Sequence, residues 1–415
     1  MKLPLFWFHF IFFTMSHKNY FSIKNFILSA LIAASFIGCK SSSSTTIENG
    51  GNNQEVTIEE ELNGIMRNNS AVGLVVVAVK EGKIIYNKSL GYKDLETKSP
   101  IADNDIIRIA SISKTFVATA ILQLVESGKL SLDSDAAEIM GFKIRNPKYP
   151  DTPITIRMLL SHTSSMSDSN GYFTLDKLNP SASATWNKAW SDYTPGSKYQ
   201  YCNLGYNTLG AIIEKVSGER FDQYIMNHIL KPLNLYGSHN VHELDPNRFI
   251  KLYTFNSSNY SHVESKSAYQ SIESELENYT MGYSTPLFSP TGGLKISPVD
   301  LAKAMMMHMN YGSLDGVKIL DSATCSMMQS MITPTNYTNE YYGLGMITTD
   351  NLLKGHTLIG HDGLALGAYT AMYWSTDRKY GFVVATNGCS GRTNYDFANI
   401  LCESVECLYK NLIKE

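Results

Sequence analysis

The stretch "IASISKTFVATAILQLVESGKLSL", residues 109–132, places Ser111 and Lys114 three positions apart at the head of a segment that is otherwise almost wholly apolar. Residues i and i+3 share one face of a helix, so the serine hydroxyl and the lysine amine can lie within hydrogen-bond distance. Free backbone N–H groups at the first turn of a helix also favour a developing negative charge. Burial lowers the pKa of a lysine and makes it a candidate base. The segment therefore predicts an activated serine nucleophile.

Taken alone, an S-x-x-K match is a weak signal, because a chain of 415 residues contains about one or two such matches by chance. A helix-capping serine and a lysine that reaches solvent would give the same letters. A second motif strengthens the interpretation. In "YQYCNLGYNTLGAIIEKVSG", residues 199–218, Tyr201 and Asn203 lie just before a predicted helix. A tyrosine hydroxyl beside a lysine can pass a proton, and an asparagine amide can orient both the lysine and a substrate carbonyl.

A third motif lies near the C-terminus. "GHDGLALGAYTAMYW", residues 360–374, contains His361, Asp362 and Gly363 at the edge of a predicted strand. A glycine at such a position allows a substrate backbone to approach closely. These three residues are therefore candidates for substrate binding.

Composition and charge limit the class of protein. The chain is 43% hydrophobic and 18% charged, as is usual for a globular protein, and its length suits one large domain or two smaller ones. With 35 basic and 38 acidic residues, the net charge is −3. No strong field would attract nucleic acid or an anionic membrane surface, so we expect no nucleic-acid partner.

The strand-rich parts of the sequence lie near both ends, and the helix-rich part lies between them. Residues 57–68 begin as a helix, and "VGLVVVAVKEGKIIYNKSLGY", residues 72–92, reads as two strands joined at Glu81-Gly82. Residues 369–385 repeat the hairpin pattern, and a helix-like stretch closes the chain. We therefore expect an α/β (α+β) fold, with one antiparallel sheet built from both chain termini, helices on its faces and an inserted, mainly helical lobe.

The first 55 residues differ from the rest. "MSHKNYFSIKNFILSALIAASFIGCK", residues 15–40, has a basic segment, an apolar segment and a small residue directly before Cys39. This resembles a bacterial lipoprotein signal peptide that starts at Met15, with Cys39 as the lipidated first residue of the mature chain. An uncleaved membrane anchor is the alternative, although the apolar segment is shorter than the about 20 residues that a span requires. We expect a signal peptide over 1–38, a lipidated flexible tether over 39–55 and the catalytic domain over 56–415.

The remaining histidines and cysteines do not predict a metal site. His239 and His242 in "SHNVHELD" have a possible ligand spacing, but no carboxylate or cysteine partner is evident, so we expect a surface loop. His162 is expected to support its own loop. We expect single buried thiols at the five cysteines after Cys39, which are Cys202, Cys325, Cys389, Cys402 and Cys407.

At the three motifs the chain resembles the serine β-lactamase and penicillin-binding-protein superfamily. The resemblance is to the class C branch, which also holds D-Ala-D-Ala carboxypeptidases, D-aminopeptidases and esterases. The motifs occur in the family's order, and "TIRMLLSHTSSM", "SPTGGLKISPVDLAK" and "YYGLGM" also look like family landmarks. The resemblance runs from about Val56 to the C-terminus and implies a β-lactamase/transpeptidase-like fold.

The resemblance also implies roles for individual residues. Ser111 would attack a carbonyl to form an acyl-enzyme, and Lys114 and Tyr201 would move its proton to the leaving group and later activate water. Asn203 would hold the substrate amide or ester. The backbone N–H groups of Ser111 and Leu364 would form the oxyanion hole. No metal or other cofactor is implied.

The third motif departs from the family pattern. His361, Asp362 and Gly363 stand where family β-lactamases usually carry Lys-Thr-Gly, and the threonine there helps to bind a substrate carboxylate. An aspartate would repel an anionic substrate by about 1 to 4 kcal/mol at about 4 Å. If Asp362 faces the cleft, we expect neutral or cationic substrates; it can instead point away, and then it does not set specificity.

The leading hypothesis is a serine hydrolase of the bacterial cell envelope, lipid-anchored on the periplasmic side or the cell surface. It would act on small esters, peptides or peptidoglycan-derived substrates. The alternatives are a D-Ala-D-Ala carboxypeptidase or class C-type β-lactamase, and a non-catalytic peptidoglycan-binding or sensor lipoprotein. The presence of Ser111, Lys114 and Tyr201 together favours an enzyme, because a protein without turnover does not need all three.

Overall fold

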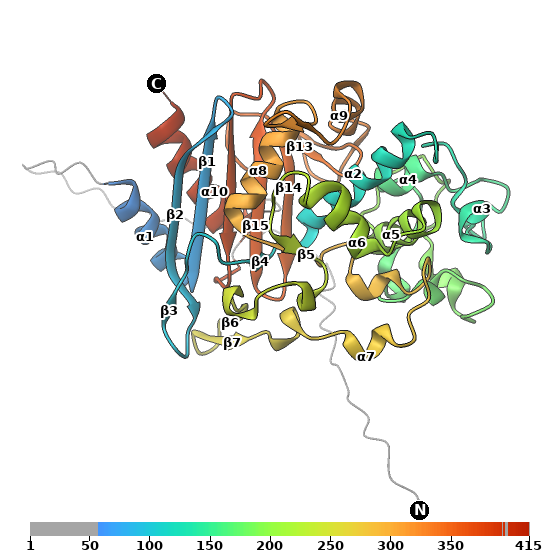
Figure 1. Cartoon of the computed structure of the whole chain (residues 1–415), viewed down its shortest axis with the longest axis horizontal. Helices are drawn as coiled ribbons and strands as arrows, with labels where there is room; N and C mark the ends of the chain where they lie inside the picture. Colours follow the sequence, from blue (N-terminus) through green and yellow to red (C-terminus); the bar gives the residue numbers. More distant parts are fainter. Residues whose placement is uncertain (1–56, 392, 395–396, 415) are drawn as a thin grey trace, which may run out of the picture. The chain divides into compact units, whose positions relative to one another are not determined.

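Two hairpins from opposite ends of the chain meet in one sheet (Figure 1). In the computed structural model, which describes residues 57–391, 393–394 and 397–414, β1 (Gly73–Lys80) pairs antiparallel with both β2 (Lys83–Asp94) and β16 (Tyr380–Thr386). The strand order is β11-β12-β13-β14-β15-β16-β1-β2-β3. The other strands are β3 (Ser99–Pro100), β11 (Thr333–Pro334), β12 (Glu340–Tyr342), β13 (Ile347–Thr349), β14 (Leu358–Ala365) and β15 (Ala368–Ser375). The predicted fold class is confirmed.

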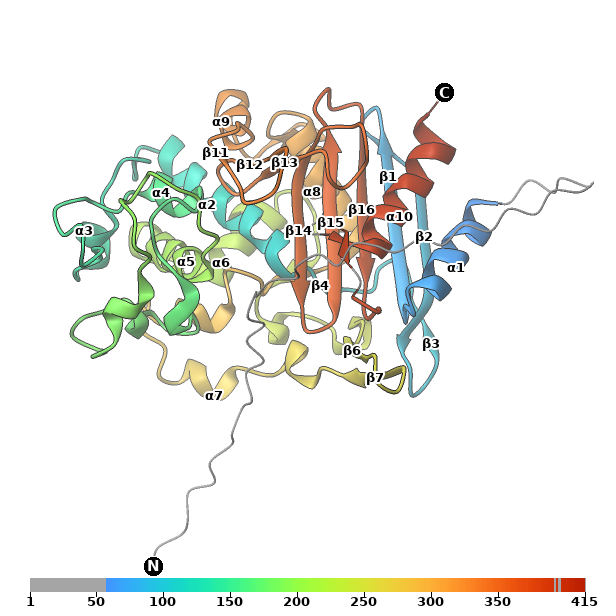
Figure 2. The same ribbon diagram turned by 180° about the vertical axis from the view of Figure 1, so that it is seen from behind.

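Helices cover both faces of this sheet. Helix α8 (Pro298–Met309) packs on one face, while α1 (Ile58–Asn68) and α10 (Asn399–Leu408) lie on the other, which Figure 2 shows from behind. β1 is buried on both faces, because alternate residues enter two different apolar clusters. This explains why its sequence reads as a continuous apolar run.

The central part of the chain forms the helical lobe beside the sheet (Figure 1). Its core is α2 (Ser113–Glu126), which is buried on almost every side and packs against α5 (Asn203–Ser217). The other helices of the lobe are α3 (Ala136–Met140), α4 (Ile156–Leu160) and α6 (Phe221–Ile225). In the described part of the chain, no helix is both long enough and apolar enough to span a membrane.

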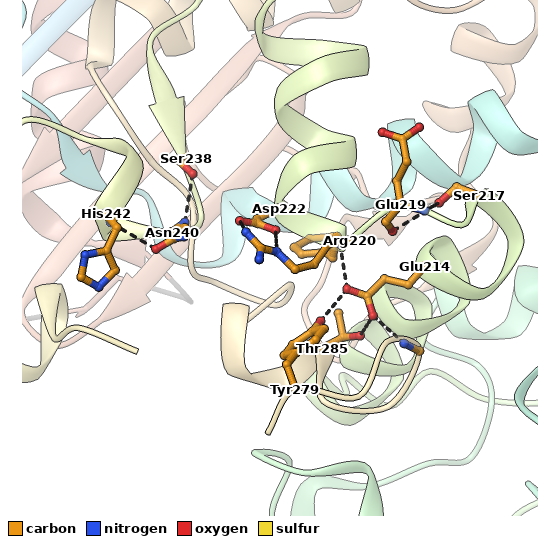
Figure 3. Close-up of polar contacts among 12 residues, drawn as sticks. Glu214, Ser217, Glu219, Arg220, Asp222, Ser238, Asn240, His242, Tyr279 and Thr285 are labelled. Atoms are coloured by element: carbon orange, nitrogen blue, oxygen red, sulfur yellow. Dashed lines mark hydrogen bonds and ion pairs between the residues drawn. The ribbon is translucent and has the colours of Figure 1, made fainter. Parts of the chain in front are cut away.

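A buried carboxylate ties this lobe to the loop that precedes the candidate site. Glu214 of α5 is 1% exposed and accepts hydrogen bonds from Thr285 Oγ1 at 2.7 Å and Gly282 N at 2.6 Å (Figure 3). It also accepts hydrogen bonds from Tyr279 and from the backbone N–H of Phe221. The side chain of Glu214 therefore holds the 279–285 segment in place.

Replacing Glu214 with alanine should destabilise the fold strongly, because several buried donors lose their acceptor, each at about 1–3 kcal/mol. We expect the free energy of unfolding, measured by urea denaturation, to fall by about 3 to 5 kcal/mol. Glu219→Ala is the matched control, since Glu219 pairs with His228 near the surface and such pairs contribute about 0–1 kcal/mol. Equal losses in the two variants would contradict the role of Glu214.

Candidate active site

Ser111 lies on a tight turn directly before α2. The turn is a 3₁₀ helix, Ala110–Ile112, and Ala110 has a φ of 49°, a left-handed conformation that non-glycine residues rarely adopt. The sequence places Ser111 in the first helical turn; the structure places it one short turn earlier, with its side chain partly exposed. The change in backbone direction at Ala110 presents the serine hydroxyl at the helix end.

Lys114 is the buried partner of Ser111. It is 0% exposed, and its Nζ donates hydrogen bonds to Ser111 Oγ at 3.0 Å and to the backbone oxygen of Thr291 at 2.8 Å. Burial lowers the pKa of Lys114 to about 7, although the carboxylates of Asp168 and Asp362 act in the opposite direction. At neutral pH the amine is therefore available in its unprotonated form, as a base requires.

Tyr201 approaches the same serine oxygen from α5's side of the site. Its hydroxyl donates a hydrogen bond to Ser111 Oγ at 2.9 Å, and burial of that hydroxyl raises its pKa well above the ordinary value. A phenol that stays protonated can relay a proton but cannot be the resting base. Lys114 is therefore the candidate base and Tyr201 the candidate proton relay.

His162 fixes the position of Tyr201. The two rings lie 4.4 Å apart between centroids, and His162 Nδ1 accepts the backbone N–H of Cys202 at 3.1 Å. Burial lowers the pKa of His162 well below its ordinary value, so the ring is neutral. The sequence predicts that His162 supports its own loop; in the structure its side chain supports the segment that carries Tyr201 and Cys202.

Asn203 links the base to two residues that the sequence analysis missed. Its Nδ2 donates to Asp168 Oδ2 at 2.9 Å, and its Oδ1 accepts the hydroxyl of Thr291. The backbone oxygen of Thr291 in turn accepts a hydrogen bond from Lys114 Nζ. Asp168 also accepts the backbone N–H groups of Asn203 and Leu204 at 2.9 and 3.0 Å, so it caps α5. Thr291 lies in the landmark "SPTGGLKISPVDLAK", whereas Asp168 carries no motif that could have identified it.

On β14, alternate residues face opposite sides of the sheet. His361 is 2% exposed and faces Tyr342, whose hydroxyl donates to His361 Nε2 at 3.0 Å because Nδ1–H donates to the backbone oxygen of Asp362. Burial and the neighbouring Lys114 lower the pKa of His361 to about 3, so it adds no positive charge to the site.

Gly363 packs against the chain segment that leads into Ser111. A Cβ atom at Gly363 would lie 2.4 Å from the backbone oxygen of Ile109 and 3.0 Å from Ala110 Cβ. From the sequence, we expect this glycine to let a substrate backbone approach closely. In the structure it is the protein's own backbone that approaches Gly363.

The structure also corrects the expectation that Asp362 faces the cleft. Its neighbours in β14, His361 and Gly363, face Ser111, so strand alternation turns Asp362 to the opposite side. There Tyr373, a member of the apolar cluster under α1 and α10, donates its hydroxyl to Asp362 Oδ1 at 3.4 Å. The charge of Asp362 also acts on Lys114, whose pKa it raises.

Leu364 lies beyond the part of β14 that pairs with β13, which ends at Gly360. Its side chain is 60% exposed. The role of its backbone N–H in an oxyanion hole stays a prediction. Cys39 lies outside the described residues. Within the described ranges, no group of three or more His, Cys, Asp or Glu side chains is arranged to hold a metal ion.

Residues 58–402 match the family described as Beta-lactamase. The chain belongs to the beta-lactamase family. This beta-lactamase relative is 29% identical to "Protein flp" of Staphylococcus aureus (strain MW2) over 324 residues, which cover 76% of this chain and 59% of that protein. It is 32% identical to "Penicillin-binding protein 4*" of Bacillus subtilis (strain 168) over 168 residues, 39% of this chain and 36% of that protein. The chain thus spans about three fifths of the length of flp.

Solved structures give the same picture of this beta-lactamase fold. The octameric penicillin-binding protein homologue from Pyrococcus abyssi superimposes with a TM-score of 0.68 at 26% identity, covering 85% of this chain and 77% of that one. D-amino acid amidase from Ochrobactrum anthropi SV3 has a TM-score of 0.64 at 21% identity, covering 85% and 98%. The superfamily of beta-lactamases and penicillin-binding proteins consists of serine hydrolases that use an acyl-enzyme.

The link between Asp168 and Lys114 gives a pH prediction for this beta-lactamase relative. The Asp168 carboxylate raises the pKa of Lys114, so Asp168→Asn should lower that pKa. The rate of Ser111 labelling by a fluorophosphonate should rise through pH about 7 in the wild type and at a lower pH in the variant. Asp176→Asn, which alters a carboxylate bonded to Tyr283 instead, should leave the midpoint unchanged. A midpoint that moves upward in Asp168→Asn would contradict the prediction.

Proposed function

We propose that this protein is a serine hydrolase that forms an acyl-enzyme on Ser111 and cleaves esters or peptide-like amides. The observation that carries the proposal is the convergence of two proton-bearing groups on one oxygen, since Lys114 Nζ and Tyr201 OH lie 3.0 and 2.9 Å from Ser111 Oγ. A nucleophile next to a base that a third group orients is the usual arrangement of an activated serine. Thr291, which holds the amine from its other side, is that third group.

Acylation begins when neutral Lys114 takes the proton of Ser111 as the serine oxygen bonds to the substrate carbonyl carbon. The carbonyl π electrons move to its oxygen, which the backbone N–H groups of Ser111 and Leu364 would stabilise. Tyr201 gives its proton to the leaving alcohol or amine as that bond breaks, and regains one from Lys114. Water then attacks the acyl carbonyl carbon while Lys114 takes its proton. The bond between that carbon and Ser111 Oγ breaks, Lys114 returns the proton to Ser111 Oγ, and the acid is released.

The charges around the base favour substrates without a negative charge near the reacting carbonyl. Asp168 and Asp362 both act on Lys114, and His361, in the position of the family's usual lysine, is neutral. We infer a preference for neutral or cationic acyl groups over β-lactams and D-Ala-D-Ala peptides, because the neutral His361 offers their carboxylates no cationic partner. Asp362 points away from Ser111 and does not set this preference. The structural likeness to D-amino acid amidase is consistent with amide substrates.

We also propose that the protein is a lipid-anchored component of the bacterial cell envelope, on the periplasmic side or the cell surface. The proposal rests on the residues before Cys39, where an apolar segment is preceded by basic residues and ends in Gly38. The polar tether after Cys39 would then separate the catalytic domain from the membrane.

Replacing Ser111 with alanine should abolish labelling by every reagent that acylates the wild type, and Lys114→Met should be nearly as damaging. Tyr201→Phe should retain some acylation but slow turnover by about 10²- to 10⁴-fold, because only the proton relay is lost. Intact-mass spectrometry and steady-state assays with p-nitrophenyl esters measure both effects.

Tyr206→Phe is the control for Tyr201→Phe. Tyr206 lies against the same lysine, but its hydroxyl donates to the backbone oxygen of Leu160 rather than to Ser111. It should slow turnover far less than Tyr201→Phe. An adduct that persists in Ser111→Ala, or equal effects of the two tyrosine changes, would reject the assigned roles. A wild type that acylates but never turns over would favour the non-catalytic alternative.

Cys39→Ser should prevent lipidation in a bacterial host. We expect wild-type protein in the membrane fraction with a diacylglycerol-sized mass increase on Cys39, and variant protein without that modification. Cys402→Ser, which alters a cysteine of the domain, should behave as the wild type. Recovery of unmodified wild-type protein in the soluble fraction would reject the anchor.

A further inference from the structure

Two cations lie side by side in a small sheet next to the candidate active site. The sheet has the order β4-β8-β5, formed by Ile107–Arg108, Lys295–Ile296 and Gly237–Ser238. Arg108 and Lys295 are direct partners across β4 and β8. Like charges directly opposite each other destabilise a strand pair, and Lys295 is only 6% exposed. The arrangement is therefore costly unless something compensates the charge.

No side chain in the described ranges provides that compensation. Neither Arg108 nor Lys295 forms an ion pair with a described residue, although the structure contains ion pairs elsewhere. Both cations line one cavity of about 210 Å³, which is also lined by Ser267, Ser271, Ser289 and Gln270. Glu275 is the only carboxylate that lines the cavity among the described residues, and it is exposed.

Several hydrogen-bond donors of the two cations are unused. Arg108 donates through Nε to the backbone oxygen of Gly292 at 2.8 Å and through NH2 to Ser289 Oγ at 3.4 Å, and its NH1 group has no acceptor among the described residues. Lys295 donates one proton, to the backbone oxygen of His239 at 2.8 Å. The remaining N–H groups are available to donate hydrogen bonds to a ligand in the cavity.

His239, another ionisable residue that lines the cavity, contributes no charge. His239, expected on a surface loop, is instead 2% exposed and hydrogen-bonds through Nδ1 to the backbone oxygen of Phe288 at 3.0 Å. Burial lowers the pKa of His239 to about 3, and burial together with Arg108 lowers that of Lys295 to about 7. A bound anion would reverse the effect on Lys295 and stabilise its charged form.

We propose that this cavity binds a small oxyanion, a carboxylate or a phosphate, between Arg108 and Lys295. The guanidinium supplies directed N–H donors, the ammonium supplies charge, and the serine hydroxyls lie along the same wall. The site is separate from the candidate catalytic residues, because the lining of the cavity includes none of Ser111, Lys114 and Tyr201. The cavity and the candidate active site share the loop that contains Thr291 and Gly292. Arg108 donates a hydrogen bond to the backbone oxygen of Gly292, and Lys114 donates one to that of Thr291.

Isothermal titration calorimetry on the full chain tests the site with inorganic phosphate in one arm and acetate in the other. Both are titrated at pH 6.5 against a chloride background of constant ionic strength. We expect saturable one-to-one binding of at least one anion, and the arm that binds identifies the ligand chemistry. Lys295→Met should weaken binding at least tenfold. Lys129→Met removes the same charge from an exposed position and should leave binding unchanged.

Ser111→Ala separates this proposal from the proposed catalysis, because it should bind the anion as the wild type does. If Lys295→Met does not fold, the unmutated protein decides: the anion should slow reductive methylation of Lys295 and not that of Lys129. Absence of saturable binding of both anions, unchanged affinity in Lys295→Met, loss of binding in Ser111→Ala, or no protection of Lys295 would each overturn the proposal.

Discussion

The structure around Ser111 depends on the complete burial of the Lys114 amine. An isolated ammonium in an apolar interior is strongly disfavoured. Burial therefore lowers the pKa of Lys114 to about 7, so the amine is close to half-protonated at neutral pH. To enclose this amine, α2 is apolar on nearly every side and α5 packs against it. β14 also lies close to the turn at Ala110, and this close approach requires a residue without a Cβ atom, Gly363. The helical lobe and the sheet are thus both needed to give one side chain its chemistry.

The same enclosure keeps the other ionisable groups of the site uncharged. His162 and His361 remain neutral and Tyr201 remains protonated because each is buried. Carboxylates are therefore the charged groups that act on Lys114. In this respect the site differs from the family pattern with Lys-Thr-Gly, because His361 supplies no positive charge where that pattern has a lysine.

The sequence was sufficient to predict some features and not others, for physical reasons. Ser111 and Lys114 meet because helical spacing is local, and the two terminal hairpins follow from strand periodicity and turn residues. The side to which Asp362 points depends on which residues of β14 face α2, and a short motif does not carry that register. Asp168 and Thr291 reach Asn203 from segments that are distant in sequence, so no local spacing connects them to the motifs. The pairing of Arg108 with Lys295 arises from β4 and β8, two-residue strands far too short to produce a pattern.

The pairing of β1 with β16 also determines when the molecule can assemble. Leu74 and Thr386 are neighbours in the sheet although they lie near opposite ends of the described chain. During synthesis the N-terminal hairpin has an open edge until the last strands emerge, and pairing of such distant segments is slow because a long loop must close first. Ser111 gains its β14 neighbour at the same late stage. Closure of the sheet, and with it completion of the candidate site, is therefore postponed until nearly the whole chain is available.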